Sequence, residues 1–171
     1  MLLWRIGVDA LPTKVNLSWR IDHFDPTCII CNYGVESCVH LFFECPFARA
    51  LWASICWGIK INPSSFVSNE DIVNLIISPP SSPLPVQDQW TISLKMMLII
   101  DEIWRTRNLT HFQESRADIH KAKQNVLSRF VELSKTFSAL TPTPYVQPIS
   151  TWTLPPIGWV KLNVDEALNN S

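Results

Sequence analysis

The sequence has no long apolar run and no apolar leader. Its longest apolar run covers residues 96–100, between Lys95 and Asp101, and is far shorter than the ~20 residues that a membrane-spanning helix needs. The first ten residues carry Arg5 and Asp9 where a secretory signal would continue its apolar segment. The sequence therefore predicts a soluble intracellular protein, nuclear or cytoplasmic, without a membrane partner.

An excess of positive charge is also missing. The 14 Lys and Arg residues face 15 Asp and Glu residues, and the formal net charge is −1. Lys and Arg drive phosphate binding because they release counterions, so strong independent binding to nucleic acid is not expected.

Glycine is scarce: 4 glycines stand against 13 prolines, which indicates stiff connecting segments. The hydrophobic fraction of 47% and the 8 tryptophans exclude a wholly disordered chain.

Five cysteines are present, and this odd number fits a metal site better than a disulfide framework. Four residues follow the pattern C-x2-C-x8-H-x4-C, namely Cys28, Cys31, His40 and Cys45. Three thiolates and one imidazole form a donor set that suits Zn²⁺. Because the protein would fill all four positions of a tetrahedron, the sequence predicts a structural zinc and not a catalytic one.

Other residues could replace a member of this set. Cys38 lies two residues before His40 and is an alternative to it or to Cys45, and His23 is a weaker alternative. Cys56 is expected to pack in the core. The competing interpretation of the whole set is that its cysteines are small buried hydrophobes, as free cysteines often are.

Apolar residues recur at helical spacing along most of the chain. Thr13 is expected to cap a short second helix after a first one at the N-terminus. Pro46 fits the first turn of a helix that should pack on this N-terminal pair. Asn69 is expected to cap the helix that follows a loop at residues 62–68.

Two longer helices are predicted in the second half of the chain. The first covers about residues 88–112, and the second starts at Ser115, whose S-x-x-D arrangement with Asp118 resembles a capping box. The basic face of the second helix could touch nucleic acid, although a solvated face is the favoured interpretation. Its predicted apolar face consists of Ile119, Ala122, Val126, Phe130, Leu133 and Phe137.

The C-terminal segment alternates in polarity. Val160, Leu162 and Val164 fall on one face and Asp165 on the other, which predicts a half-buried strand with no visible partner in the chain. The predicted fold class is therefore mainly α: a small zinc-stabilised helical domain with a helical extension and a single orphan C-terminal β-strand. The predicted divisions are the zinc-binding domain at 1–60, a short helix and Pro-rich linker at 61–86, the two-helix extension at 87–138, a Pro-rich linker at 139–157, and the strand segment at 158–171.

Three stretches resemble the zinc-binding region of reverse transcriptases from plant non-long-terminal-repeat retroelements, and the plant proteins derived from them. The stretches are LLWRIGVDALPTKVNL, TCIICNYGVESCVHLFFECPFARALW and EIWRTRN. This resemblance implies a retrotransposon-derived, zinc-binding module.

The tail PPIGWVKLNVDEA resembles the first strand of a ribonuclease H-type domain, in which the strand ends in an Asp that helps hold two Mg²⁺ ions. Asp165 takes this position, and Glu166 stands where the family usually has Gly. Two-metal hydrolysis needs several converging carboxylates, and in the family these come from later segments that the chain does not contain. We therefore expect no catalytic residue in this chain and no enzyme activity.

Three functions follow as hypotheses. The first is a structural zinc module, non-catalytic alone, with weak nucleic-acid binding at most. The second is a fragment of an RNA–DNA hybrid ribonuclease. The third is a protein-interaction module, because a small core is not expected to hide all of its tryptophans, although core packing is the favoured interpretation for most of them. These tryptophans are Trp4, Trp19, Trp52, Trp57, Trp90 and Trp104.

Overall fold

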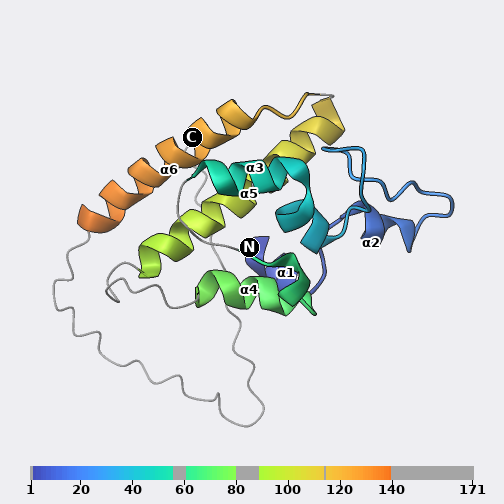
Figure 1. Ribbon diagram of the computed structural model, residues 1–171, viewed down its shortest axis with the longest axis horizontal. Helices are drawn as coiled ribbons and strands as arrows, with labels where there is room; N and C mark the ends of the chain where they lie inside the picture. The colour runs from blue at the N-terminus through green and yellow to red at the C-terminus, as the bar shows by residue number, and fades with distance from the viewer. Residues whose placement is uncertain (1, 56–60, 80–88, 114, 140–171) are drawn as a thin grey trace, which may run out of the picture. The chain divides into compact units, whose positions relative to one another are not determined.

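The computed structural model describes residues 2–55, 61–79, 89–113 and 115–139, which belong to one unit of packed helices (Figure 1). The described part is mainly helical, as predicted, and holds no strand; it has one isolated bridge between Thr27 and Val35. The predicted C-terminal strand, with Asp165, lies outside the described residues. The elements are α1 (Leu2–Gly7), α2 (Lys14–Ser18), the π-helical turn η1 (His40–Glu44), α3 (Pro46–Ser54), the 3₁₀ turn η2 (Pro63–Ser65), α4 (Asn69–Ile77), α5 (Gln89–Gln113) and α6 (Ile119–Ala139).

Two of the predicted helix starts are confirmed. The Thr13 hydroxyl accepts a hydrogen bond from the Asn16 amide at 3.3 Å and caps α2. Pro46 is the first residue of α3, where its missing N–H leaves no intrahelical bond unmade.

Two other predicted caps are wrong. Ser68, and not Asn69, caps α4, because the Asp71 carboxylate reaches back to the Ser68 amide at 2.8 Å and completes a capping box. At α6 the cap is Asp118 itself, whose carboxylate accepts hydrogen bonds from the amides of His120 and Lys121. The helix therefore begins four residues after Ser115, because Asp118 satisfies its first free amides directly.

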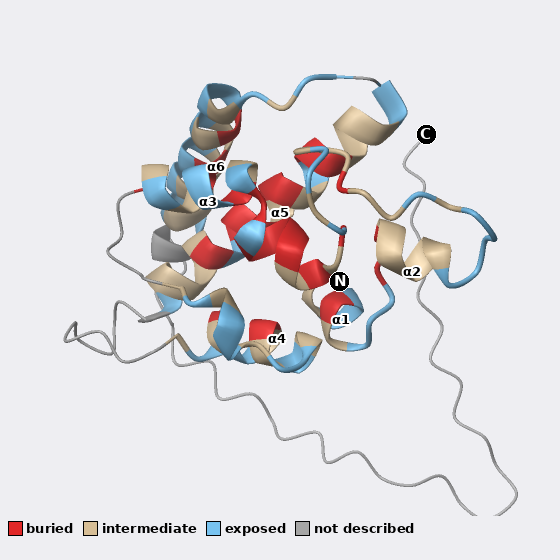
Figure 2. Ribbon diagram, turned by 45° about the vertical axis from the view of Figure 1, so that its right-hand side comes forward, coloured by how far each residue is buried: buried red, intermediate tan, exposed pale blue. Residues whose placement is uncertain are grey.

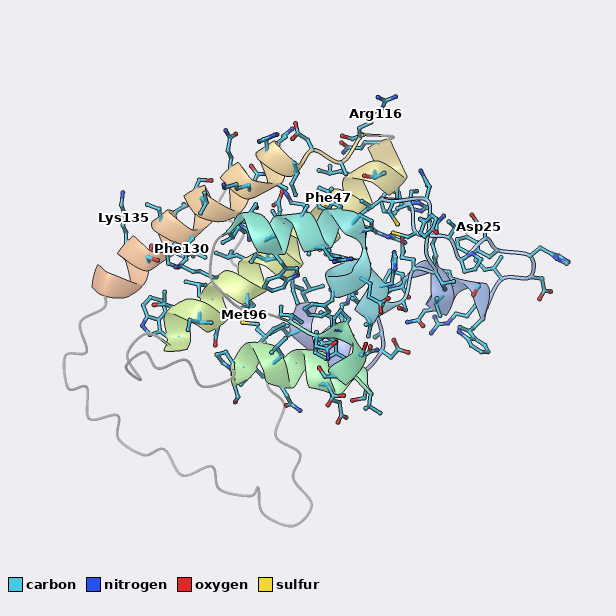
Figure 3. The ribbon with its side chains drawn as sticks, in the orientation of Figure 1. Asp25, Phe47, Met96, Arg116, Phe130 and Lys135 are labelled. Atoms are coloured by element: carbon cyan, nitrogen blue, oxygen red, sulfur yellow. The ribbon has the colours of Figure 1, made fainter. Side chains whose placement is uncertain are left out.

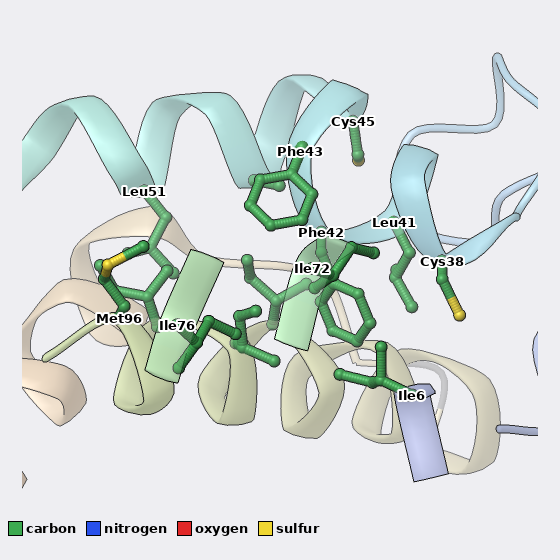
Figure 4. Close-up of a cluster of buried hydrophobic side chains, with 14 of the residues drawn as sticks. Ile6, Cys38, Leu41, Phe42, Phe43, Cys45, Leu51, Ile72, Ile76 and Met96 are labelled. Carbon is green, nitrogen blue, oxygen red and sulfur yellow. The ribbon is translucent and has the colours of Figure 1, made fainter. Parts of the chain in front are cut away.

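Helix α5 carries the largest share of the buried apolar side chains, and the other elements pack around it (Figure 2). Helix α6 lies along α5, α4 also contacts it, and α1 packs mainly on α4. Side chains from α1, α4 and η1 converge above α5, among them Ile6, Ile72 and Phe42 (Figure 4). The buried apolar residues of α5 are Met96, Leu98, Ile99, Ile100 and Ile103.

Helix α3 packs against η1, α6 and α5, and not chiefly on the N-terminal pair as predicted. Its buried residues are Ala48 and Leu51, whereas Ala50 is exposed. On α6, Ala122 and Val126 are buried as predicted.

Charged side chains such as Arg116 and Lys135 extend away from the core (Figure 3). Among the described residues, none of the helices combines the length and the apolar character that crossing a bilayer would require.

Candidate metal centre

The first two cysteines lie in residues 26–37, which we name the ligand loop. Its turns are closed by backbone hydrogen bonds: the Cys28 amide donates to the Gly34 carbonyl at 2.7 Å, and the Asn32 amide donates to the Cys28 carbonyl at 2.8 Å. Asn32 has a φ of 55°, a left-handed conformation that asparagine adopts more readily than most residues. The chain therefore turns back after Cys31 and brings both sulfur atoms to one side.

The other two residues stand at the ends of the π-helical turn η1. The Cys45 amide donates to the His40 carbonyl at 2.7 Å, which is the i to i+5 bond of a π turn. At the start of the turn, the His40 amide donates to the Ser37 hydroxyl at 3.1 Å. Three consecutive side chains between the ends, those of Leu41, Phe42 and Phe43, are buried in the core and anchor this turn.

The structure brings Cys28, Cys31, His40 and Cys45 together. One donor atom from each lies within 4.8 Å of every other. In a tetrahedron with metal–sulfur bonds of ~2.3 Å, neighbouring sulfur atoms stand roughly 3.8 Å apart, so small side-chain movements suffice to close a four-coordinate site. The soft donors also fit Zn²⁺ chemically, and these four residues form a candidate metal centre.

Cys28 and Cys45 are both fully buried, and their side chains share a hydrogen bond. This contact with Cys45, together with burial, raises the pKa of the Cys28 thiol far above its ordinary range. The same contact with Cys28 lowers the pKa of Cys45, and the amides of Ala48 and Phe47 at the start of α3 act in the same direction. The two sulfur atoms are therefore close enough to interact directly.

The His40 ring is oriented by groups on both sides. Its Nε2 lies 3.4 Å from the Cys31 sulfur, and its Nδ1 lies 3.8 Å from a carboxylate oxygen of Glu44. This is the arrangement of a metal-binding histidine whose second nitrogen faces a carboxylate. Burial lowers the pKa of His40, so the neutral, metal-binding form of the ring is favoured. A Cβ atom on Gly34 would stand 2.6 Å from Nδ1, so the ring packs directly on this glycine.

The alternative ligands do not join the cluster. Cys38 is buried in the core, and burial raises its pKa to about 12. His23 is exposed. Cys56, expected to pack in the core, lies outside the described residues.

Sequence reasoning missed a buried ion pair beside the centre. Glu36, in the ligand loop, is fully buried and pairs with Arg107 of α5 at 2.9 Å. The signal for Arg107 was available, since it continues the helical spacing of Ile99, Ile100 and Ile103 on the buried face of α5. No sequence pattern in the ligand loop indicated that Glu36 would be buried.

The described tryptophans divide into two groups. Trp52 and Trp104 pack against the core, and the Trp52 indole donates to the Phe42 carbonyl at 2.8 Å. Trp4, Trp19 and Trp90 are exposed, with Trp19 at 83%. The core therefore hides only part of the set, and Trp57 lies outside the described residues.

Comparison with known proteins places the cluster in a family context. No curated protein and no solved structure matches the chain. Residues 1–52 match the model of a family described as zinc-binding in reverse transcriptase, and this matched segment contains all four residues of the candidate metal centre.

Proposed function

We propose that the helical unit is a structural zinc module in which Cys28, Cys31, His40 and Cys45 hold one Zn²⁺ ion. The observation that carries this proposal is the convergence of three sulfur atoms and one imidazole within 4.8 Å, inside the segment that matches the zinc-binding family. When bound, the ion would supply a cross-link between the ligand loop and the π-helical turn.

A structural role is favoured over a catalytic one because the donor set is closed. Four protein ligands satisfy tetrahedral Zn²⁺, whereas a catalytic zinc keeps one position for water or substrate. Cys28 and Cys45 are fully buried, and only Cys31 and the edge of His40 approach the surface. The ligand loop has few buried apolar side chains, so the ion would provide much of the order that packing supplies elsewhere.

Metal analysis of the purified full chain tests the proposal. We expect one equivalent of zinc, and we expect Cys31→Ser to lose it, because a hydroxyl cannot replace a thiolate donor. The control is Cys38→Ser, which changes a cysteine outside the cluster and should keep one equivalent. A zinc-free chain with intact helical circular dichroism, or equal loss in both variants, would overturn the assignment.

A specific observation favours a second, weaker function, which is contact with single-stranded nucleic acid. Trp19 follows α2 and Tyr33 lies in the ligand loop, and both rings are more than four-fifths exposed. Stacking on an aromatic ring contributes about 1–3 kcal/mol per base, independent of sequence. Arg20 is the basic neighbour of Trp19, while Asp22 and Asp25 offset it, so we propose weak binding with little dependence on salt.

Anisotropy of a labelled oligouridine measures this contact. We expect weak binding that is lost in a Trp19→Ala/Tyr33→Ala variant and retained in Trp4→Ala. Trp4 is an exposed tryptophan on α1 and serves as the matched control. Binding that survives the double substitution, or that no variant affects, would contradict the assignment to these rings.

We propose further that the chain has no ribonuclease activity of its own. Asp165 is the position that resembles the first carboxylate of a ribonuclease H-type site, and two-metal cleavage needs more than one such group. An assay on an RNA–DNA hybrid with Mg²⁺ should show no turnover for the full chain or for Asp165→Asn. Cleavage by the chain that Asp165→Asn abolishes would overturn this proposal.

A further inference from the structure

The buried ion pair connects the ligand loop to the central helix. Arg107 of α5 directs its Nε and Nη2 to one carboxylate oxygen of Glu36, at 3.1 and 2.9 Å, across 71 residues of sequence. The Glu36 side chain is fully buried and that of Arg107 is 2% exposed. Both charges are therefore removed from water, where each depends on the other for compensation.

Glu36 also organises the backbone around it. The carboxylate oxygen that binds Arg107 accepts a hydrogen bond from the Lys14 amide at 3.0 Å, at the start of α2. Its second oxygen accepts from the Ile29 amide at 3.3 Å, between Cys28 and Cys31. A single carboxylate thus holds the segment that carries two of the four metal-binding residues.

Arg107 adds a connection to the N-terminal segment. Its Nη2 donates to the Pro12 carbonyl at 3.0 Å, and its Nη1 donates to the Asn108 side chain at 3.2 Å. The ring of Trp104 lies 5.2 Å from the guanidinium carbon. Only the planar fork of arginine offers donors in these several directions, so lysine cannot reproduce the set.

The sign of the charges matters beside the proposed metal centre. Three thiolates and Zn²⁺ carry a net charge of −1, and an uncompensated Glu36 would add a second negative charge close to it. Arg107 neutralises that carboxylate. Two effects therefore act together: the arginine fixes the loop through Glu36, and it removes a repulsive charge from the neighbourhood of the thiolates.

We propose that Arg107 is a positioning residue for the metal centre, acting through Glu36, so that zinc affinity depends on a helix outside the segment that matches the zinc-binding family. The proposal rests on the zinc-binding function proposed above. Its consequence is that metal occupancy and the packing of α5 are coupled, although no residue of α5 belongs to the cluster.

Competition of the full chain with a chromogenic zinc chelator tests the dependence. We expect Arg107→Lys to weaken zinc binding about 10–100-fold, the range in which outer partners of metal ligands act. Two controls lie in the same region. Ile103→Ala destabilises α5 without touching Glu36, and Arg129→Met removes an exposed ion pair between Arg129 of α6 and Asp101 of α5. Both should lose less affinity than Arg107→Lys.

Hydrogen exchange of the wild-type chain gives a measurement that does not require a variant to fold. Removing zinc should reduce amide protection around Arg107 in α5 as well as in the ligand loop, and more than it does in the second half of α6. Protection of α5 that does not respond to zinc would contradict the coupling.

The outcomes separate the two proposals. If the wild-type chain binds no zinc, the proposed function fails and the coupling fails with it. If the wild type binds one zinc and Arg107→Lys loses no more affinity than Ile103→Ala, the function stands and the positioning role of Arg107 is overturned.

Discussion

The ligand loop and helix α5 share one core but are held in different ways. Within the ligand loop, only Cys28 and Glu36 are buried; Cys28 belongs to the candidate metal centre, and Glu36 is paired with Arg107. Helix α5 buries five apolar side chains between Met96 and Ile103, and this burial needs no ion. The conformation of the ligand loop therefore depends on polar partners and on a metal, whereas that of α5 depends on apolar burial. Arg107 connects the two regions.

The largest expected effect on stability comes from α5. Ile103 is fully buried, and Ile103→Ala should lower the free energy of unfolding by about 2–5 kcal/mol, because the deleted carbons leave a cavity. Urea denaturation of the zinc-loaded chain measures this, with zinc stoichiometry as the control quantity. If the substitution abolished zinc binding while the helices remained folded, the claim that different interactions hold the two regions would be wrong.

A substitution in the ligand loop should lower zinc affinity more than it lowers the stability of the helices. In Gly34→Ala the new methyl group would stand 2.6 Å from Nδ1 of His40, so the imidazole or the ligand loop must shift from the arrangement that brings the four donors together. We expect zinc affinity to fall about 10–100-fold, as for other changes that misorient a metal-binding histidine.

The chain offers a matched control for this experiment. A Cβ atom on Gly7 would meet the side chain of Val73 at an ordinary contact distance of 3.4 Å, so Gly7→Ala should leave zinc affinity unchanged. Equal zinc affinity in Gly34→Ala and the wild type would show that the loop adapts more freely than its contacts indicate.

Zinc affinity should depend on pH more strongly than the stability of the helices does. The pKa of Cys28 is raised, so this thiol keeps its proton through neutral pH and must release it when the metal binds. The pKa of His40 is lowered, so above about pH 6.5 the ring is already neutral and contributes little to the slope. Zinc affinity should therefore rise with pH, by about tenfold per pH unit for each displaced proton.

Competition titrations between pH 6.5 and 8.5 measure this slope. The apolar packing of α5 contains no group that titrates in this range, so the urea midpoint of the metal-free chain should change far less. A zinc affinity independent of pH would mean that the thiols are already ionised in the free protein.

The smallest effect is expected at the exposed ion pair between Arg129 of α6 and Asp101 of α5. Arg129 and Asp101 lie 2.6 Å apart, but their side chains are 38% and 42% exposed. Exposed pairs contribute about 0–1 kcal/mol, so Arg129→Met should shift the urea midpoint only slightly. A large loss here would show that exposure does not separate this pair from Glu36–Arg107.

The candidate metal centre was predictable because its signal is local. Cys28 and Cys31 are separated by two residues and His40 and Cys45 by four, and few side-chain chemistries other than metal binding account for such spacing. The helices were predictable from apolar periodicity. Their caps were less so, because Ser68 and Asp118 compete with neighbours of similar chemistry, and only the bonds actually formed decide between them.

The connection between the regions could not be predicted in the same way. Glu36 and Arg107 are 71 residues apart, and a charged residue within each segment is ordinarily expected to face solvent. Packing decided otherwise, because the buried face of α5 continues past Ile103 to Arg107. The helices predicted as an extension therefore share a core with the metal-binding segment.

The π-helical turn at His40–Glu44 has a consequence for how this segment can vary. One backbone hydrogen bond joins the carbonyl of His40 to the amide of Cys45, so two residues of the candidate metal centre stand at its two ends. Removing one residue would leave an ordinary α-turn and rotate Cys45 by roughly 100° about the axis. The length HLFFE therefore cannot change without separating the Cys45 sulfur from the His40 imidazole.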